Sequence, residues 1–306
     1  SGVTLSSDGT DLLLDGTAIG GGGAALELYA ENPVSAVTPI ATGNNSISIG
    51  SNSQAASTNG NSIAIGTTAR ATGNSSAAFG GNFPNASAAG SLALGYTPTA
   101  SGAFSAAIGY DAKAVGDSSV AFTKSYASGT DSFAAAIANN TSSYGATGAN
   151  SIAMGYQAKA TAFSGFAFGY QNQSTANYAV TVGRNNVGSS QYSLAIGYEA
   201  TTRATPSIAF AVGSFSGIAG QHQASMFVLR SRTTDATPSV LTSDGGSSGS
   251  TNDQIILPNN SAYAFHGTIV ARQQASGGTA SAAWKVEGLI RREGSAGTTV
   301  LVNSAT

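Results

Sequence analysis

A five-residue phrase recurs twelve times between residues 46 and 211. It consists of a small residue, an apolar residue, alanine or an equivalent, a second apolar residue and usually glycine, as in Ser62–Gly66 and Ser91–Gly95. Most copies are 14 residues apart, and they begin at residues 46, 62, 76, 91, 105, 119, 134, 151, 165, 179, 193 and 207. This period is too short for a helix pair or a propeller blade and suits one coil of a stacked β-structure. The sequence therefore predicts an all-β, parallel solenoid of about twelve coils, which is usually a scaffold or a binding surface.

The segments between the phrases alternate alanine with polar residues and often end in glycine or asparagine, as in Ala69–Gly73 and Ala112–Gly116. Period-two patterning bounded by turn residues predicts two short strands and two turns in each coil. Each strand then lies above its equivalent one coil earlier, at a spacing of about 4.8 Å, so twelve coils would extend for roughly 55 Å.

The phrase is apolar or small at every position, which predicts that both faces of its strand are buried. One face can pack inside the coil, where alanine and serine leave room for only a thin core, and the other face needs an external partner. Symmetry makes a second copy of the same chain the default partner. We expect the coil core and the contact between chains to be built by Ile47, Ile49, Ile63, Ile65, Phe79, Leu92, Leu94, Ile108, Ile152, Phe166, Phe168, Leu194 and Ile196.

The Ser-Ile-Ala-Ile-Gly and Ala-Thr-Gly-Asn-x-Ser phrases, repeated at this period, resemble the head of the YadA-type trimeric adhesins. The resemblance covers over half of the chain and implies a left-handed parallel β-roll assembled as a parallel homotrimer. The pattern departs from the family at Thr123 and Ala138, where glycine is missing, and before Ser151, where the spacing between phrases is stretched. Local loops are expected at these places.

Three regions are expected: an N-terminal β region for attachment at residues 1–40, the β-roll repeats at 41–220, and a C-terminal module at 221–306. Strands are expected in the first region at Leu5, Leu12–Leu14 and Ala25–Leu28. The C-terminal region contains several alternating strand candidates, which favour a β-sandwich. Its sequence resembles modules of bacteriophage tail and neck fibre proteins, and such a module would continue beyond Thr306.

The composition argues against several classes of partner. Charged residues make up only 8% of the chain and the net charge is −2, so there is no basic patch for nucleic acid or for a membrane surface. No apolar run approaches the roughly 20 residues of a membrane helix. There is no cysteine for a disulfide or for thiolate chemistry.

No constellation of residues indicates catalysis, a cofactor or a metal. The carboxylates Asp111, Asp117, Asp131 and Glu199 are scattered singly and are expected to be solvated turn residues. His222 and His266 are too few for a metal site and are expected to be structural.

Tyrosines follow the glycine of several phrases, so the solenoid should stack Tyr96 over Tyr110 and Tyr156 over Tyr170 as a structural ladder. Receptor contact is instead expected in the irregular loops at residues 51–61, 81–90 and 139–150, because such insertions project from a solenoid without breaking it. The candidate contact residues in these loops are Phe83, Asn139, Asn140 and Tyr144.

These observations favour a structural, homotrimeric fibre on the surface of a bacteriophage virion, with other virion proteins and a glycan or protein of the host surface as partners. Trimerisation would turn weak contacts into avidity. One alternative is the head of a bacterial trimeric autotransporter adhesin, and a second is a tailspike that cleaves polysaccharide.

Overall fold

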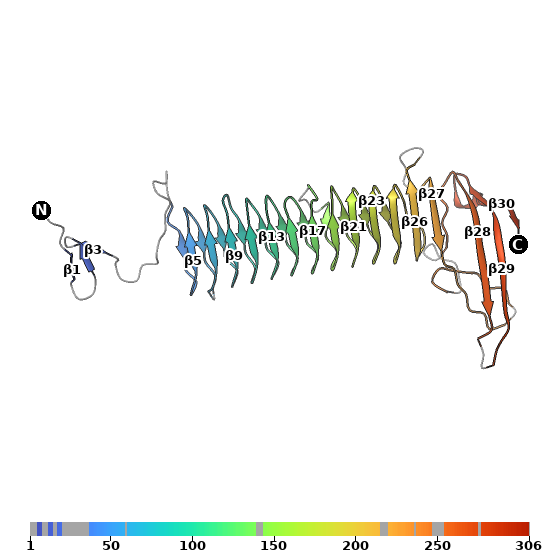
Figure 1. The fold of residues 1–306 in the computed structure, drawn as a ribbon, viewed down its shortest axis with the longest axis horizontal. Coiled ribbons are helices and arrows are strands. Elements are labelled where there is room, and N and C mark those ends of the chain that lie inside the picture. The colour runs from blue at the N-terminus through green and yellow to red at the C-terminus, as the bar shows by residue number, and fades with distance from the viewer. Residues whose placement is uncertain are drawn as a thin grey trace. The chain divides into compact units, whose positions relative to one another are not determined.

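The computed structural model describes residues 5–7, 12–14, 17–19, 37–58, 60–138, 143–214, 220–235, 237–246, 254–274 and 277–305 (Figure 1). The chain divides into two compact units, Ser1–Gln171 and Asn172–Thr306. Together the units contain about twelve turns of parallel β-solenoid, and the described residues contain almost no helix. The all-β solenoid expected from the repeats is therefore confirmed.

Each coil of the first unit contributes two short strands, as the repeat pattern predicts. The apolar phrases form β5 (Ile47–Ile49), β7 (Ile63–Ile65), β9 (Ala77–Phe79), β11 (Leu92–Leu94), β13 (Ala106–Ile108), β15 (Val120–Phe122), β17 (Phe133–Ala135), β19 (Ile152–Met154) and β21 (Phe166–Tyr170). The linking segments form β4 (Ile40–Ala41), β6 (Gln54–Ala55), β8 (Arg70–Ala71), β10 (Asn85–Ala86), β12 (Thr99–Ala100), β14 (Lys113–Ala114), β16 (Tyr126–Ala127), β18 (Gly145–Ala146) and β20 (Lys159–Ala160). We call the first set the phrase sheet and the second set the linker sheet. Strands of each sheet pair in parallel with their equivalents in adjacent coils.

The interior of the coils is made of alanine. The phrase sheet points its central alanines inward, such as Ala93 and Ala107, and the linker sheet points the second residue of each strand inward, such as Ala100 and Ala114. All four are fully buried, and the register places each alanine directly over its equivalent in the next coil. Alanine-sized side chains fill most of the space between the two sheets, so the core is thin, as expected.

Serine begins most phrases and is buried at the corner of the coil. The hydroxyls of Ser76, Ser91 and Ser119 donate to the carbonyl three residues earlier, at 2.7, 2.7 and 2.6 Å. These bonds satisfy hydroxyls that would otherwise be buried at a cost. The serine of the phrase is therefore a corner residue of the coil.

The glycine that ends most phrases is needed at the next corner. Gly95 has φ +130°, and a Cβ placed on it would lie 2.5 Å from the carbonyl oxygen of Gly109 in the following coil. Gly81, which directly follows the phrase-ending Gly80, is different, because nothing lies within 4 Å of the position that an added Cβ would occupy. Gly95, unlike Gly81, is therefore required by both the backbone conformation and the close approach of the next coil.

The phrase expected at residues 134–138 is displaced by two residues. Phe133 pairs with Val120 and with Ile152, and Ala134 pairs with Ala121, so the phrase is Ser132-Phe-Ala-Ala-Ala136. The interval to the next phrase therefore runs from Ser132 to Ser151 and is longer than the interval from Ala134 that the sequence pattern suggested. Ile137, which the sequence pattern placed in the phrase, is instead fully buried beyond its end.

The N-terminal strands are β1 (Leu5–Ser7), β2 (Leu12–Leu14) and β3 (Thr17–Ile19), which pair as an antiparallel meander. Two of the strands expected in this region are thus confirmed. The strand expected at Ala25–Leu28 lies outside the described residues.

The second unit begins with further coils: β22 (Gln173–Ser174) and β24 (Val187–Gly188) of the linker sheet, and β23 (Val180–Arg184), β25 (Leu194–Tyr198) and β26 (Ser207–Val212) of the phrase sheet. Strand β27 (Gln223–Phe227) then pairs with β26 in the antiparallel direction. In the parallel coils Asn172 and Asn186 are fully buried, and the Asn186 side chain donates to the carbonyls of Val182 and Gly197. This internal amide ladder is satisfied by the backbone.

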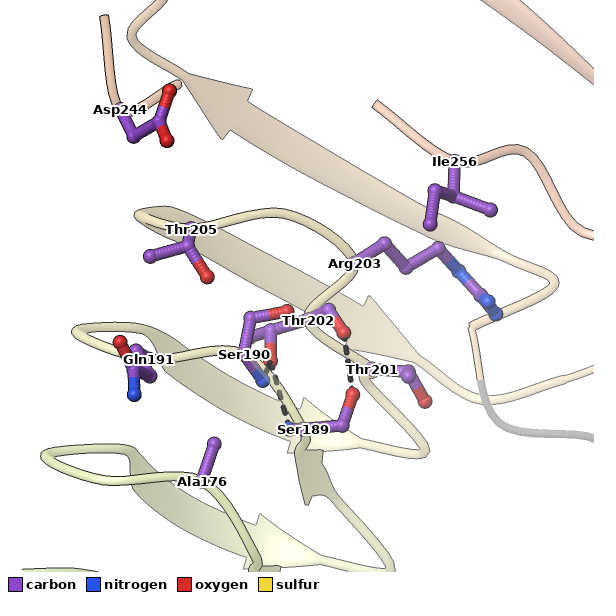
Figure 2. A pocket seen from close by; sticks show the side chains of 10 residues that line it. All are labelled: Ala176, Ser189, Ser190, Gln191, Thr201, Thr202, Arg203, Thr205, Asp244 and Ile256. Carbon is purple, nitrogen blue, oxygen red and sulfur yellow. Dashed lines mark hydrogen bonds between the residues drawn. The ribbon is translucent and has the colours of Figure 1, made fainter. Parts of the chain in front are cut away.

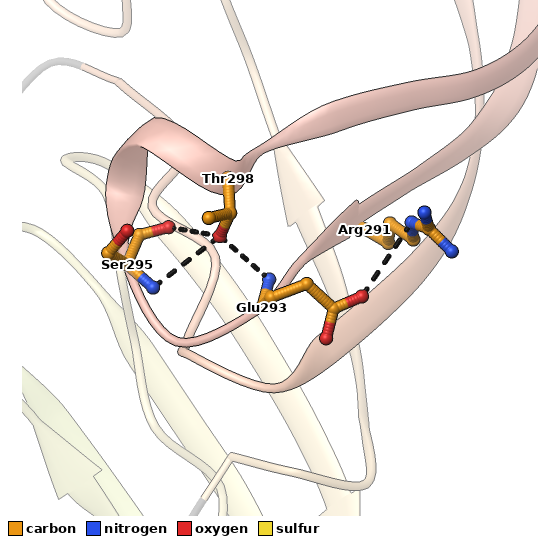
Figure 3. Close-up of polar contacts among 4 residues, drawn as sticks. All are labelled: Arg291, Glu293, Ser295 and Thr298. Atoms are coloured by element: carbon orange, nitrogen blue, oxygen red, sulfur yellow. Dashed lines mark hydrogen bonds and ion pairs between the residues drawn. The ribbon is translucent and has the colours of Figure 1, made fainter.

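The unit ends in one antiparallel sheet of β28 (Ser261–Arg272), β29 (Ser281–Arg292) and β30 (Val300–Ala305). Figure 3 shows the connection from β29 to β30, in which the short 3-10 helix η1 (Ala296–Thr298) is held by the Thr298 hydroxyl. This hydroxyl donates to the Ser295 carbonyl at 2.6 Å and accepts from the Glu293 amide at 3.1 Å. The Arg291 side chain lies 3.7 Å from the Glu293 carboxylate in an exposed ion pair.

Strands are expected in the C-terminal region at Met226–Leu229, Gln254–Leu257, Ala262–Arg272, Ala282–Arg291 and Thr298–Val302. Those at Ala262–Arg272 and Ala282–Arg291 are confirmed as β28 and β29, those at Met226–Leu229 and Thr298–Val302 are confirmed in part by β27 and β30, and Gln254–Leu257 is irregular. Strands β28, β29 and β30 form one three-stranded sheet.

Candidate functional site

All thirteen residues expected in the coil core or at the chain contact lie on the outward face of the phrase sheet. Residues alternate across a strand, so the buried central alanine forces its two neighbours outward. None of the thirteen is buried in the single chain, and Ile47, Leu94 and Phe168 are 48%, 42% and 46% exposed. The interior of the coil therefore belongs to alanine and not to these side chains. Their burial against another chain stays a prediction.

These side chains form one continuous column in each unit, which we call the apolar stripe. In the first unit Leu92 pairs with Ala106 and Leu94 with Ile108, and the same register runs from β5 to β21. In the second unit Val180, Leu194 and Ile208 follow one another in register. Every coil adds apolar surface at the same place, so the stripe grows with the number of coils.

The outward face of the linker sheet has a different character. The first residue of each linker strand points outward, and in most coils it is polar or charged, as with Gln54, Arg70, Asn85, Thr99 and Lys113. The solenoid thus has one apolar side and one polar side. A long apolar surface is typical of a protein interface.

The expected tyrosine ladder is confirmed. The rings of Tyr96 and Tyr110 stack at a centroid distance of 5.7 Å with an angle of 20° between their planes, and those of Tyr156 and Tyr170 stack at 5.0 Å with an angle of 16°. Lys124 extends the first stack, with its ammonium 5.3 Å from the centre of the Tyr110 ring.

The sequence analysis missed a third stack, between Tyr178 and Tyr192 in the second unit, at 5.0 Å and 6°. These tyrosines precede the phrase and do not follow its glycine, and both have positive φ. Their separation by one repeat period is the signal that could have found them.

The candidate receptor residues have different environments. Phe83 is 55% exposed at a turn with positive φ, which leaves its ring open to contact. Tyr144 is partly buried and packs against the alanine core, so it supports the coil and does not project as expected. Asn139 and Asn140 lie outside the described residues.

The carboxylates of the repeats are not all dispersed, because Asp117 and Asp131 lie in adjacent coils, where the Asp131 amide donates to the Asp117 carbonyl at 2.9 Å. Asp117 and Asp131 are exposed, and the Asp117 carboxylate accepts a hydrogen bond from the Ala103 amide at 2.9 Å. Glu199 departs from the expectation, because its residue is only 7% exposed. His222 and His266 are both exposed, and their structural role stays a prediction. Within the described part of the chain, no three His, Cys, Asp or Glu residues gather closely enough to hold a metal ion.

In the described part of the chain, three titratable groups have perturbed pKa values, all in the second unit. Hydrogen bonds from Thr237 lower the pKa of Asp235, and the Gly246 amide lowers the pKa of Asp244. Burial raises the pKa of Tyr263, whose hydroxyl donates to the Gly220 carbonyl at 3.1 Å. Hydrogen bonds to an ionised carboxylate favour that form, whereas burial of a phenol favours the neutral form.

Among the described residues, no helix is long and apolar enough to span a membrane. A search of curated proteins found no match to this chain.

Four segments of the first unit match the family described as YadA head domain repeat (2 copies). The matched residues are 41–60, 57–82, 100–122 and 146–162, which fall on the parallel coils. The match agrees with the resemblance seen in the repeated phrases. The solenoid is therefore similar to YadA-like adhesin head repeats.

Proposed function

We propose that this chain is a non-enzymatic, homotrimeric fibre of a bacteriophage virion that attaches the particle to the host surface. The observation that carries the proposal is the apolar stripe, which occupies one side of the coils while the other side is polar. A thin alanine core contributes little burial per residue, so a stripe of Ile, Leu and Phe offers the larger hydrophobic gain on association.

The trimer is supported by the match to YadA-like head repeats, because heads of this kind are homotrimeric adhesins. Three parallel chains would bury their stripes about a common axis and leave the polar linker sheets in solvent. Three copies of each receptor contact would then act together, which raises avidity without a strong individual site.

The virion assignment rests on the resemblance of the C-terminal module to bacteriophage fibre modules, and a β-sandwich is proposed for this module. The alternative is a bacterial trimeric adhesin, which the YadA-like repeats favour equally. The second alternative is a tailspike that cleaves polysaccharide, and release of reducing ends from host capsule would establish it.

Native mass spectrometry of the chain tests the first step, with a trimer as the expected result. A stable monomer or dimer at micromolar concentration would refute the assembly. Gold-labelled antibodies to the chain test the second step, because they should decorate purified phage particles and not the envelope of uninfected bacteria. Labelling of the bacterial envelope alone would establish the adhesin alternative.

A further inference from the structure

A cavity of about 540 Å³ lies in the second unit, at the corners of its last coils (Figure 2). Its volume is in the range of small-molecule binding sites, about 300–1,000 Å³. Four stretches of chain surround it: the corner after β22, the corner after β24, the loop between β25 and β26, and the segment that follows β27. The lining residues are Ala176, Ser189, Ser190, Gln191, Thr201, Thr202, Arg203, Thr205, Asp244 and Ile256.

The wall of the cavity is held in place by hydrogen bonds. The Thr202 hydroxyl accepts from the amides of Ser189 and Ser190 at 3.1 and 3.2 Å, and the Ser189 hydroxyl donates to the Thr202 carbonyl at 2.8 Å. On the other side, the backbone amide and carbonyl of Thr201 are both bound by the Gln223 side chain, each at 2.9 Å. The Arg203 guanidinium lies beside the phenol of Tyr263. The cavity is therefore largely formed before any ligand arrives.

The lining is polar and of mixed hydrogen-bonding character. Eight of the ten residues carry a hydroxyl, an amide or a charge, and they include one guanidinium and one carboxylate. The hydroxyl of Thr201 is fully buried, so this residue lines the cavity without offering its hydroxyl to a ligand.

This chemistry selects a particular class of ligand. Sugar hydroxyls both donate and accept, so they can use Arg203 as a donor, Asp244 as an acceptor and the serine and threonine hydroxyls in either sense. The Gly246 amide donates to the Asp244 carboxylate at 2.8 Å, which keeps it ionised and available as an acceptor. An acidic sugar would meet this carboxylate, whereas a neutral sugar leaves the Arg203 and Asp244 charges balanced. Ile256 supplies the apolar contact that the carbon face of a sugar requires.

We propose that this cavity is a binding site for one neutral sugar unit of a surface glycan, separate from the irregular loops. The proposal rests on the proposed attachment function, since a fibre that attaches to a surface needs a ligand there. It assigns the glycan contact to the second unit.

The test uses the full chain and methyl glycosides of glucose, galactose, mannose, N-acetylglucosamine and glucuronic acid, with binding measured by saturation-transfer NMR. At least one neutral glycoside should bind with a dissociation constant in the millimolar range, as expected for a few polar contacts. The double variant Gln191→Ala/Asp244→Ala should weaken this binding about tenfold or more, because each lost hydrogen bond to a ligand contributes about 1 kcal/mol.

Asp235→Ala is the matched control. Asp235 and Asp244 are both exposed, and each accepts a 2.8 Å hydrogen bond from the amide two residues further on, but only Asp244 lines the cavity. The control should bind the glycoside as the unmodified protein does.

The proposal is overturned if no neutral glycoside binds, if glucuronide binds best, or if the double variant binds normally. It is also overturned if Asp235→Ala weakens binding as much as the double variant does. Attachment of the fibre to host cells is measured separately. If the protein binds the sugar but not the host cells, the attachment function fails and the sugar site stands. If the protein binds the host cells but not the sugar, the sugar site fails and the attachment function stands.

Discussion

Replacing Gly95 with alanine should destabilise the solenoid strongly, although it adds only one methyl group. The residue has φ +130°, and the new Cβ would lie 2.5 Å from the Gly109 carbonyl oxygen and 2.9 Å from its carbonyl carbon. The backbone conformation alone costs a non-glycine residue about 1–3 kcal/mol. To relieve the clash, the two coils must also separate at this corner.

Separation would weaken the ladder on both sides of the corner. The Gly95 amide donates to the Phe79 carbonyl at 2.9 Å, and the Gly109 amide donates to the Leu94 carbonyl at 2.7 Å. Loss of one or two such bonds costs about 1 kcal/mol each. The expected loss in the free energy of unfolding is therefore about 2–5 kcal/mol for each chain.

Gly81→Ala is the control, since the added Cβ meets nothing within 4 Å and the φ of Gly81 lies outside the glycine-specific range. This change should leave stability unchanged or raise it by up to about 1 kcal/mol, through the unfolded chain. Guanidinium unfolding followed by far-UV circular dichroism, at one fixed protein concentration, measures both variants. Equal midpoints for Gly95→Ala and Gly81→Ala would refute the requirement for glycine at the corner.

Three further outcomes are expected. Ile65→Asp should abolish the trimer in native mass spectrometry, because an unpaired charge in a buried contact costs on the order of several kcal/mol. The control Arg70→Asp, on the polar linker sheet, should remain trimeric. If both variants form trimers, the contact between chains does not involve the apolar stripe. Shortening the chain between Ile137 and Tyr144 to the regular period should preserve the melting temperature, since loops tolerate change, and lost β-structure would contradict this. Tyr263→Phe should lower the free energy of unfolding below pH 10. The difference in stability between this variant and the unmodified protein should disappear as the pH rises through the raised pKa of Tyr263 in the folded protein, because ionisation removes the phenol proton that bonds the Gly220 carbonyl. A pH-independent difference in urea midpoints would show that the phenol proton is not involved.

The repeated phrase was sufficient to predict the coils, the parallel pairing and the tyrosine stacks that follow its glycine. It did not separate the inward alanines from the outward apolar residues in the list of core positions, although the alternation was present in the sequence. The phrase that begins at Ser132 was predicted at the wrong position because Ala134–Ala138 has a similar composition. The choice between these two positions depends on the pairing of Phe133 with Val120 and Ile152, which the sequence does not show.

The cavity of the second unit could not be predicted. Its lining comes from segments that are far apart in the sequence, from Ala176 to Ile256, and each segment reads as an ordinary polar turn. No short pattern in the sequence brings these turns together. The single C-terminal sheet was also unexpected, because alternating strands predict a buried face but do not specify what covers it.

The alanine interior has a consequence for how the chain finds its correct order. Because nearly every coil presents the same alanines to its neighbours, a strand that skipped one coil would meet an interior of the same shape. The coils that begin at Ser46, Ser76 and Ser132 are longer than the regular period and the coil that begins at Ser119 is shorter, so each of these matches only its own place. Irregular coils thus fix the register in which the coils stack and disfavour misaligned pairings, whereas a solenoid of uniform coils would have no such constraint.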